Sequence, residues 1–462
     1  MVAHTALSIP RRAKRRIIPL LLLLLQLGDI SHAQVAIGQW QDHFSYNTAR
    51  HLAVSKDYIF TAYTNAAAIF NRSDGIIERL SKATGLSDAG ISTIGYDPTT
   101  KSLVIAYTNS NIDILQHDVV YNISDLRRAT AAGDKAIYDV AFHRRKAYLA
   151  TGIGILVIDL DRQEIETTCY LGTEGTPEPV YSVAVSNTRL YAATAKGLYS
   201  IDASSRYPNI TSLWQHDDST LLSNRSIALI RAQNNDLILL AETTNPSVRE
   251  VYRLATQGIV MIDSGDVQSV QCCADLTTVT KTDRVRVFRN DNTLQREVSS
   301  FLYGDMTVHD AVDLGDGTLL VAHDWAGTFL LAENGELTSI NPKGNVSDNV
   351  YGLTAFNNTV YLAPGGKNTT NANMWIPANV FSYNNNEWNQ LQNRDLLANV
   401  ADILQVAVDP TDPSHIAAAA WGYGIIEIRD NKVVAFHNAE NTNGAIQKYW
   451  VGSWSAVQYF CI

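Results

Sequence analysis

The stretch AYLATGIGILVID, residues 147–159, is echoed by LYAATAKGLYSID, residues 190–202. Nine residues in and before the first stretch recur unchanged 43 positions later: Tyr138, Val140, Ala141, Tyr148, Ala150, Thr151, Gly154, Ile158 and Asp159. A similar spacing appears earlier, because Ala-Tyr-Thr-Asn occurs at 62–65 and again 44 residues on, at 106–109. Nine identities at one offset indicate an internal repeat of about 43 residues.

Each repeat predicts the same succession of short strands. YSVAV (181–185) and RLYAAT (189–194) have the pattern of β-strands, and a polar turn separates them. Gly197 marks a tight turn into a third strand, LYSID, because glycine adopts positive φ without a steric penalty. A variable fourth stretch completes roughly four strands per repeat, as in a β-propeller blade. Helical repeats of similar period are excluded, and a string of β-sandwich domains is the alternative.

Further hairpins follow the same plan with less sequence identity. They begin near residues 49 and 91, and near Ile227, Val267, Val308, Asn349 and Asp402. With the two repeats above they total nine, whereas propellers typically close with about four to eight blades. We therefore expect an all-β chain, with a seven-bladed β-propeller followed by the start of a second, incomplete propeller.

The joint between the two rings is expected at NPKGNVSDN, residues 341–349, which is rich in turn-forming residues. The expected domains are a first propeller at 34–340, the first blades of a second propeller at 341–445, and an aberrant tail at 446–462 that fits no blade. The eighth hairpin carries an insertion at 365–379. Because two blades cannot close a ring, the pattern predicts a chain that ends early.

The first 33 residues predict a secretory signal peptide. A basic cluster between Arg11 and Arg16 precedes the apolar run Ile17 to Leu25, and Ser-His-Ala follows at 31–33. This order predicts cleavage between Ala33 and Gln34. A membrane anchor is the alternative, but the run is well short of the roughly 20 apolar residues that span a bilayer. We therefore expect an exported protein.

The charge of the chain limits its partners. The formal net charge is −10, and removal of residues 1–33, with five basic residues and one acidic residue, makes it −14. An acidic surface argues against binding of nucleic acid and of anionic lipid head groups. A local basic groove for a polyanion remains compatible with this charge.

Sequence motifs for catalysis, phosphate binding or metal binding are absent, so we expect no enzyme activity, no cofactor and no metal. The 11 histidines do not cluster. His143 is predicted to be exposed at a hairpin turn, and His309 and Asp310 to begin a blade strand. The four cysteines, Cys169, Cys272, Cys273 and Cys461, lack zinc-site spacing and are predicted to be small, partly buried thiols.

Two aromatic features have both a binding and a structural interpretation. The segment 38–54 contains Trp40, Asp42, His43 and Tyr46. It could form a binding edge, but we favour a closing strand of the ring with Trp40 buried. Trp325 and Trp421 fall in equivalent blade turns, where they could stack on a sugar. We favour the interpretation that each caps its blade.

The order of these elements resembles a known family. GQWQDHFSYNTARHLAV (38–54), the repeats ending ATGIGILVID and ATAKGLYSID, and SHIAAAAWGYGIIEI (414–428) are similar to the PorZ family of the type IX secretion system of Bacteroidota. The resemblance spans about residues 35–445 and includes repeats like those of two-component-regulator propellers. It implies two propellers and a C-terminal β-sandwich export signal, from which this sequence departs by stopping inside the second propeller.

The resemblance implies a non-catalytic protein of the outer membrane and cell surface. Members bind anionic lipopolysaccharide and assist a sortase, with other attachment-complex proteins, in processing and anchoring secreted cargo. No binding residue of the family can be carried over to a numbered position here. The alternatives are a sensor propeller of a hybrid two-component regulator and a carbohydrate-binding or carbohydrate-active propeller.

Overall fold

The computed structural model describes residues 40–447 except 131–132, 187, 219–221, 300–306, 346, 392–396 and 398. The predicted signal peptide with its cleavage at Ala33 and Gln34, and residues 448–462 of the predicted tail, lie outside the described residues. The chain divides into two compact units, of which Gln41–Asp348 is here called the ring unit. The C-terminal unit contains Trp40 and the described residues from Asn349 onward.

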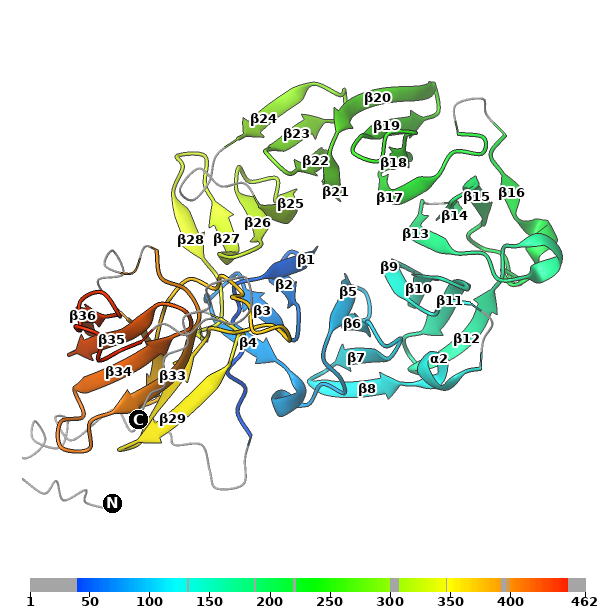
Figure 1. Cartoon of the computed structure of the whole chain (residues 1–462). Helices are drawn as coiled ribbons and strands as arrows, with labels where there is room; N and C mark the ends of the chain where they lie inside the picture. The colour runs from blue at the N-terminus through cyan, green and yellow to red at the C-terminus, as the bar shows by residue number, and fades with distance from the viewer. Residues whose placement is uncertain are drawn as a thin grey trace, which may run out of the picture. The chain divides into compact units, whose positions relative to one another are not determined.

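The ring unit consists of antiparallel four-stranded sheets, in each of which the strand order follows the chain. Figure 1 shows these sheets around a circle, with their first strands toward its centre. The strands of the first two sheets are β1 (Ala49–Val54), β2 (Tyr58–Tyr63), β3 (Ala67–Asn71), β4 (Ile77–Leu80), β5 (Ile91–Asp97), β6 (Ser102–Tyr107), β7 (Ile112–Gln116) and β8 (Val119–Ile123). The next two contain β9 (Ile137–His143), β10 (Lys146–Thr151), β11 (Gly154–Asp159), β12 (Glu164–Cys169), β13 (Val180–Val185), β14 (Arg189–Thr194), β15 (Gly197–Asp202) and β16 (Gln215–His216).

The remaining sheets of this unit continue the pattern. Their strands are β17 (Ile227–Gln233), β18 (Asp236–Glu242), β19 (Arg249–Ala255), β20 (Gly258–Gly265), β21 (Val267–Cys273), β22 (Leu276–Lys281), β23 (Val285–Arg289), β24 (Leu294–Val298), β25 (Val308–Asp313), β26 (Leu319–His323), β27 (Gly327–Leu331) and β28 (Leu337–Ser339). Short helices lie between sheets or before a last strand: η1 (Lys82–Thr84), α2 (Asp125–Arg128), η2 (Thr173–Gly175) and η3 (Thr211–Leu213). The repeated four-stranded sheets confirm the predicted all-β, propeller-like fold, and β17, β21 and β25 begin at the predicted residues.

The repeated alanines occupy equivalent buried positions. Ala150 in β10 pairs with Asp139 in β9, and Ala193 in β14 pairs with Ser182 in β13, at the same offset of 43 residues. Both alanines have 0% exposed surface. Second strands such as β10 lie between two others and are apolar on both faces, because sheets pack on either side of them. The predicted register of the repeat is thereby confirmed.

The predicted glycine turns join the second and third strands. Gly154 has φ +137° and Gly197 has φ +123°, conformations that side chains rarely tolerate. Thr151 and Thr194 fix these turns, because their hydroxyls donate to the carbonyls of Gly154 and Gly197 at 2.8 and 3.0 Å. The Ala-Thr-x-x-Gly sequence therefore encodes the turn with both a hydrogen bond and a permissive backbone.

Buried hydrophobic clusters fill the spaces between neighbouring sheets. Ile112 and Leu149, for example, belong to the cluster between the second and third sheets. The last sheet packs in the same way on the first, because Leu320 in β26 joins Leu52 and Ile59 in one cluster. The sheets of this unit therefore close on themselves through side-chain packing.

The predicted closing strand is wrong in part. Residues 49–54 form the first strand of the first sheet, but residues 40–48 form no strand, and Trp40 is 88% exposed rather than buried. The first and last sheets already contain four strands each from consecutive chain, so neither takes a strand from the other. Instead, the loop holds the last sheet: the Gly327 amide donates to the Asn47 carbonyl at 2.6 Å, and the Thr48 hydroxyl donates to the Asp324 carbonyl at 2.9 Å.

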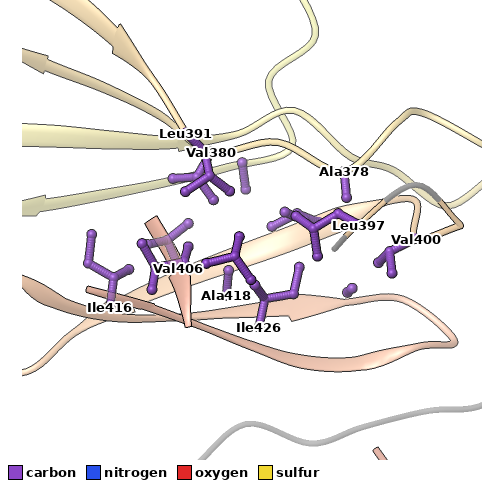
Figure 2. Close-up of a cluster of buried hydrophobic side chains, with 14 of the residues drawn as sticks. Ala378, Val380, Leu391, Leu397, Val400, Val406, Ile416, Ala418 and Ile426 are labelled. Atoms are coloured by element: carbon purple, nitrogen blue, oxygen red, sulfur yellow. The ribbon is translucent and has the colours of Figure 1, made fainter. Parts of the chain in front are cut away.

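The C-terminal unit contains two further four-stranded sheets with one shared core. Figure 2 shows this core, in which Val380 and Leu391 face Val406, Ala418 and Ile426. The strands are β29 (Gly352–Phe356), β30 (Thr359–Ala363), β31 (Phe381–Asn384), β32 (Glu387–Gln390), β33 (Ile403–Val408), β34 (His415–Ala420), β35 (Gly424–Arg429) and β36 (Lys432–His437).

The predicted insertion lies between β30 and β31 and is held by one buried carboxylate. Asp402 has 0% exposed surface and accepts hydrogen bonds from the amides of Met374, Trp375 and Ile376 at 3.0, 3.0 and 3.1 Å. The Trp421 amide also donates to the Asp402 carbonyl, at 2.8 Å. One residue therefore ties the insertion to the following sheet.

Candidate functional site

A repeated irregularity at the first strand of the sheets shapes the centre of the ring unit. The pairing with the second strand skips one residue near the start of each first strand: Arg50, Ser92, Tyr138, Tyr181, Ala228, Gln268 and His309. Such bulges bend a strand and re-aim its side chains. All of the skipped residues except Ser92 line one central cavity.

Two cavities lie along the first strands. The mouth cavity, of about 690 Å³, is bounded by the skipped residues, and the inner cavity, of about 330 Å³, is bounded by residues further along the same strands. Six residues line both cavities and are here called the polar layer: His51, Thr93, Asp139, Arg231, Gln271 and Asp310. Polar groups at the same place in several repeats thus meet between the two cavities.

One half of the polar layer is an ion pair. The Arg231 guanidinium donates to the Asp139 carboxylate at 2.8 Å, and the Ser182 hydroxyl also donates to Asp139. Burial disfavours the charge of Arg231, but the Asp139 carboxylate outweighs that effect and raises the pKa of Arg231. Three adjacent sheets therefore contribute Asp139, Ser182 and Arg231 to this network.

The other half is centred on a buried carboxyl group. Asp310 accepts from the Ser269 hydroxyl at 2.5 Å, the Gln271 amide at 2.8 Å and the Leu52 backbone amide at 3.2 Å. Burial raises the pKa of Asp310 despite these hydrogen bonds, and burial lowers the pKa of the nearby His51. Both shifts favour the uncharged forms of this pair.

The carboxyl groups of the polar layer thus already accept hydrogen bonds from neighbouring sheets, as members of a structural network do. Within the described ranges, no group of three or more His, Cys, Asp or Glu residues could hold a metal ion. The arrangement is suited to binding through hydrogen bonds.

A second network lies at the rim of the mouth cavity. The Arg50 guanidinium lies 2.6 Å from His309 Nε2, which lies 2.9 Å from a carboxylate oxygen of Asp324. Arg50 is also 3.6 Å from the same oxygen. These contacts cross the junction between the last sheet and the first, so the rim is held where the ring closes.

The predicted strand residues His309 and Asp310 do lie near the start of β25, and the structure adds that both line the mouth cavity. Sequence reasoning missed this role and also missed His51, Asp139 and Arg231. The signal was present in the repeat register, because His51, Asp139 and Asp310 each directly follow a skipped residue.

His143 was expected to be exposed, and this prediction is wrong. It ends β9 and is partly buried, since that strand packs against its neighbours before the turn begins. Burial, and then the charge of Arg144, lowers the pKa of His143.

The segment 42–48 has contacts that support a structural role. The Tyr46 hydroxyl donates to Asp42 at 2.8 Å, and the Ser81 hydroxyl donates to the same carboxylate at 2.7 Å. Tyr46 is 1% exposed and packs in the cluster that joins the last and first sheets. Burial lowers the pKa of His43. Asp42 and Tyr46 thus fasten the segment to the ring unit.

Both candidate tryptophans lie in turns, as predicted. Trp421 is 8% exposed, its indole N–H donates to the Asn371 carbonyl at 3.0 Å, and the Lys367 ammonium lies 4.8 Å from its ring centre. These contacts confirm that Trp421 caps its sheet. Trp325 is 41% exposed and makes an edge contact with His323.

The cysteines in the described ranges are free thiols, as predicted. Cys169 is buried, and burial raises its pKa to about 12. Cys272 and Cys273 are partly buried and pack in different clusters, on opposite faces of β21. Cys461 lies outside the described residues.

Among the described residues, no helix has the length and hydropathy needed to cross a membrane.

In the comparison with known proteins, part of this chain matches the model of one protein family. Residues 59–215 match the family model described as "TSS9, PorZ, N-terminal beta-propeller domain". The solved structure of PorZ from Porphyromonas gingivalis, described as an essential bacterial surface component of the type-IX secretion system, is similar with a TM-score of 0.74 at 21% sequence identity. That match covers 91% of this chain and 55% of the PorZ chain. The resemblance seen in the sequence is thereby confirmed.

Two other solved structures are less similar. One belongs to the mitotic checkpoint complex, with a TM-score of 0.44, 13% identity, and coverage of 71% of this chain and 97% of that chain. The other is the Cps50 (Swd1) β-propeller domain of Myceliophteria thermophila, with a TM-score of 0.47, 10% identity, and coverage of 62% and 97%. The comparison with curated proteins found no match.

Proposed function

We propose that this chain is a PorZ-like, exported component of a type IX secretion system that acts at the cell surface without catalysing a reaction itself. The observation that carries the proposal is the match of residues 59–215 to the family's N-terminal propeller. The structural similarity to PorZ over 91% of the chain supports it. The match covers 55% of the PorZ chain, so the proposed role applies only to the part of PorZ that this chain matches.

The proposed architecture is a seven-bladed propeller followed by the first blades of a second one. The continuous series of four-stranded sheets from β1 to β28, packed first against last, supports the first ring. The two sheets from β29 to β36 would begin the second. The compact units divide at Asp348, so residues 341–348 would belong to the first propeller rather than to the second.

The proposed role is to bind anionic lipopolysaccharide and to assist a sortase, with other attachment-complex proteins, in processing and anchoring cargo. A closed ring of sheets offers a rigid surface for such partners. The formal net charge of −10 means that an anionic ligand needs a locally basic site. Binding should therefore weaken as salt concentration rises.

Deletion of the coding sequence in the bacterium that makes this chain tests the secretion role. The expected result is cargo that accumulates with uncleaved C-terminal signals and is lost from the surface, with recovery on complementation. If cargo is processed and anchored as in the parent strain, the proposal fails. A change in the transcription of one operon with normal cargo would instead favour the two-component sensor.

Two further measurements address export and ligand. Mass spectrometry of the envelope-associated protein is expected to find an N-terminus at Gln34, and a retained leucine run would contradict the export signal. Surface plasmon resonance is expected to show binding to anionic lipopolysaccharide and weaker binding to the same lipopolysaccharide after dephosphorylation. Equal binding to both preparations would contradict charge-based recognition.

A further inference from the structure

The mouth cavity has two chemically different walls. On one side, β9, β13 and β17 contribute apolar surface from Tyr138, Tyr181 and Leu229. The same strands also contribute Asp139, Ser182 and Arg231, which are already bonded to one another. On the other side, β21, β25 and β1 contribute polar groups from Gln268, Ser269, His309 and Arg50. In Figure 1, β9 and β13 lie across the centre of the ring from β25 and β1. A ligand in this cavity would meet aromatic carbon on one side and hydrogen-bonding groups on the other.

The aromatic wall is preorganised. The rings of Tyr138 and Tyr181 have centroids 5.9 Å apart and an interplanar angle of 65°, so they support each other edge to face. The Tyr138 hydroxyl donates to Asp134 at 3.1 Å, which fixes the orientation of that ring, and Tyr138 remains 38% exposed. Tyr181 is half-buried, so the exposed ring of Tyr138, supported by Tyr181 from the neighbouring sheet, offers a surface for stacking.

The charges that line the cavity are already paired. Arg231 is bound to Asp139, and Arg50 contacts His309 and lies near Asp324. Glu242, also in the lining, accepts from the Ser226 hydroxyl at 3.1 Å and is 3.8 Å from Arg249. A charged ligand would have to compete with these contacts, whereas an uncharged ligand can bind beside them.

The polar wall presents both donors and acceptors. Gln268 carries an amide with both functions, Ser269 carries a hydroxyl, and Arg50 carries donors only. A sugar ring matches this set, because its hydroxyls both donate and accept and because its axial C–H groups form an apolar face. The volume of about 690 Å³ lies within the range of about 300–1,000 Å³ found for small-molecule sites.

We propose that the mouth cavity binds a neutral carbohydrate, with one sugar ring against Tyr138 and Tyr181 and its hydroxyls bonded to Gln268, Ser269 and Arg50. This site is separate from the charge-dependent binding of lipopolysaccharide proposed above. The carbohydrate would reach the polar layer but would not need to displace its hydrogen bonds. Failure of this inference leaves the proposed secretion role intact.

Binding to an array of neutral oligosaccharides, followed by calorimetric titration with those retained, tests the site on the purified full chain. We expect the wild-type chain to retain at least one neutral oligosaccharide. Tyr138→Ala and Tyr181→Ala should each weaken binding at least tenfold, and Gln268→Ala should weaken it severalfold. Tyr207→Ala is the matched control, because Tyr207 is 60% exposed in the same unit and does not line the cavity.

Melting temperature and lipopolysaccharide binding are measured on the same variants. If a tyrosine variant unfolds, Tyr181→Phe and Gln268→Ala are compared instead. Tyr181→Phe keeps the ring and should bind like the wild type, whereas Gln268→Ala, at an exposed position, should bind more weakly. Retention of no neutral oligosaccharide at millimolar concentration would overturn the proposal. Equal binding by the wild type and the cavity variants, or binding of peptides alone, would overturn it as well.

Discussion

At the scale of single residues, the small size of Ala193 is a packing requirement. Ala193 is fully buried and lies in a cluster with Leu198, Ile230 and Leu239. Ala193→Leu should therefore overpack the space between two sheets and lower the free energy of unfolding by roughly 1–3 kcal/mol. Urea unfolding measures the change, and Ala195→Leu, at an exposed position in the next turn, serves as control. Equal stability of the two variants would contradict the repeat alignment.

His216 gives the ring unit a pH-dependent contact. The hydrogen bond with Asp218, at 2.8 Å, raises the pKa of His216, burial opposes the shift, and the Lys196 carbonyl, at 3.0 Å, supports it. Because the folded pKa exceeds the ordinary 6.5, this contact contributes stability below that pH and loses it as the pH rises through the folded value. The side chain of Asp218 is 87% exposed, so the effect should stay below about 1 kcal/mol.

The measurement is the free energy of unfolding between pH 5.5 and 8.5. His216→Gln should flatten the decline of stability with rising pH, and Asp218→Asn should reduce it by removing the main partner. An unchanged pH profile in both variants would show that the contact does not contribute to folding.

At the scale of elements, the tight turn between the second and third strands depends on glycine for two reasons. Gly154 has φ +137°, and a Cβ there would lie 2.2 Å from the Cys169 carbonyl oxygen on the fourth strand. Gly424 in the C-terminal unit has φ +145° and the same conflict with the His437 carbonyl, at 2.1 Å. The fourth strand therefore lies too close to the turn to leave room for a side chain at this glycine.

Gly154→Ala is expected to destabilise the protein more than Gly258→Ala. Gly258 has φ +130° but no atom within 4 Å of an added Cβ, so its substitution adds only backbone strain of roughly 1–3 kcal/mol. Gly154→Ala adds the steric conflict to a similar strain. Thermal unfolding of both variants measures the difference in stability. Equal losses of stability would mean that the fourth strand moves to accommodate the added Cβ at no cost.

Strands and turns were predictable from the sequence because their signals are local. Alternating side chains and glycine spacing placed β10, β11, β14 and β15 correctly. The polar layer was not predictable in the same way, since Asp139 and Arg231 are 92 residues apart and meet only when consecutive sheets pack around a common centre. The closing strand was misassigned because the alternation of apolar and polar residues in 38–54 does not show where strand pairing begins. The early part has this pattern although it packs on the sheets as a loop.

At the scale of the whole molecule, residues 341–348 connect the two ends of the ring unit. The Asn341 side-chain oxygen accepts from the Thr328 amide at 2.6 Å and from the Tyr63 hydroxyl at 3.0 Å. Asp348 accepts from the Ser45 amide at 2.5 Å. A fragment that ends at residue 340 lacks these contacts between the last and first sheets.

The fragment 34–348 is expected to fold alone and to melt cooperatively at a higher temperature than 34–340. The reason is that ring closure removes the exposed strand edges that promote aggregation. Residues 349–462 alone should be insoluble or sensitive to protease, because two sheets leave faces uncovered. Calorimetry and limited proteolysis of the three fragments measure this. A stable 349–462 fragment, or equal melting of the two ring fragments, would contradict the assignment.

Among the described residues, the junction between the first and last sheets contains side chains and a loop but no strand shared between them. Each sheet is therefore encoded by one uninterrupted segment of gene. Duplication or loss of such a segment adds or removes a sheet with all of its ladder hydrogen bonds intact. The similar units at 137–159 and 180–202, with nine identical residues at one offset, are what a duplication of this kind would leave in the sequence.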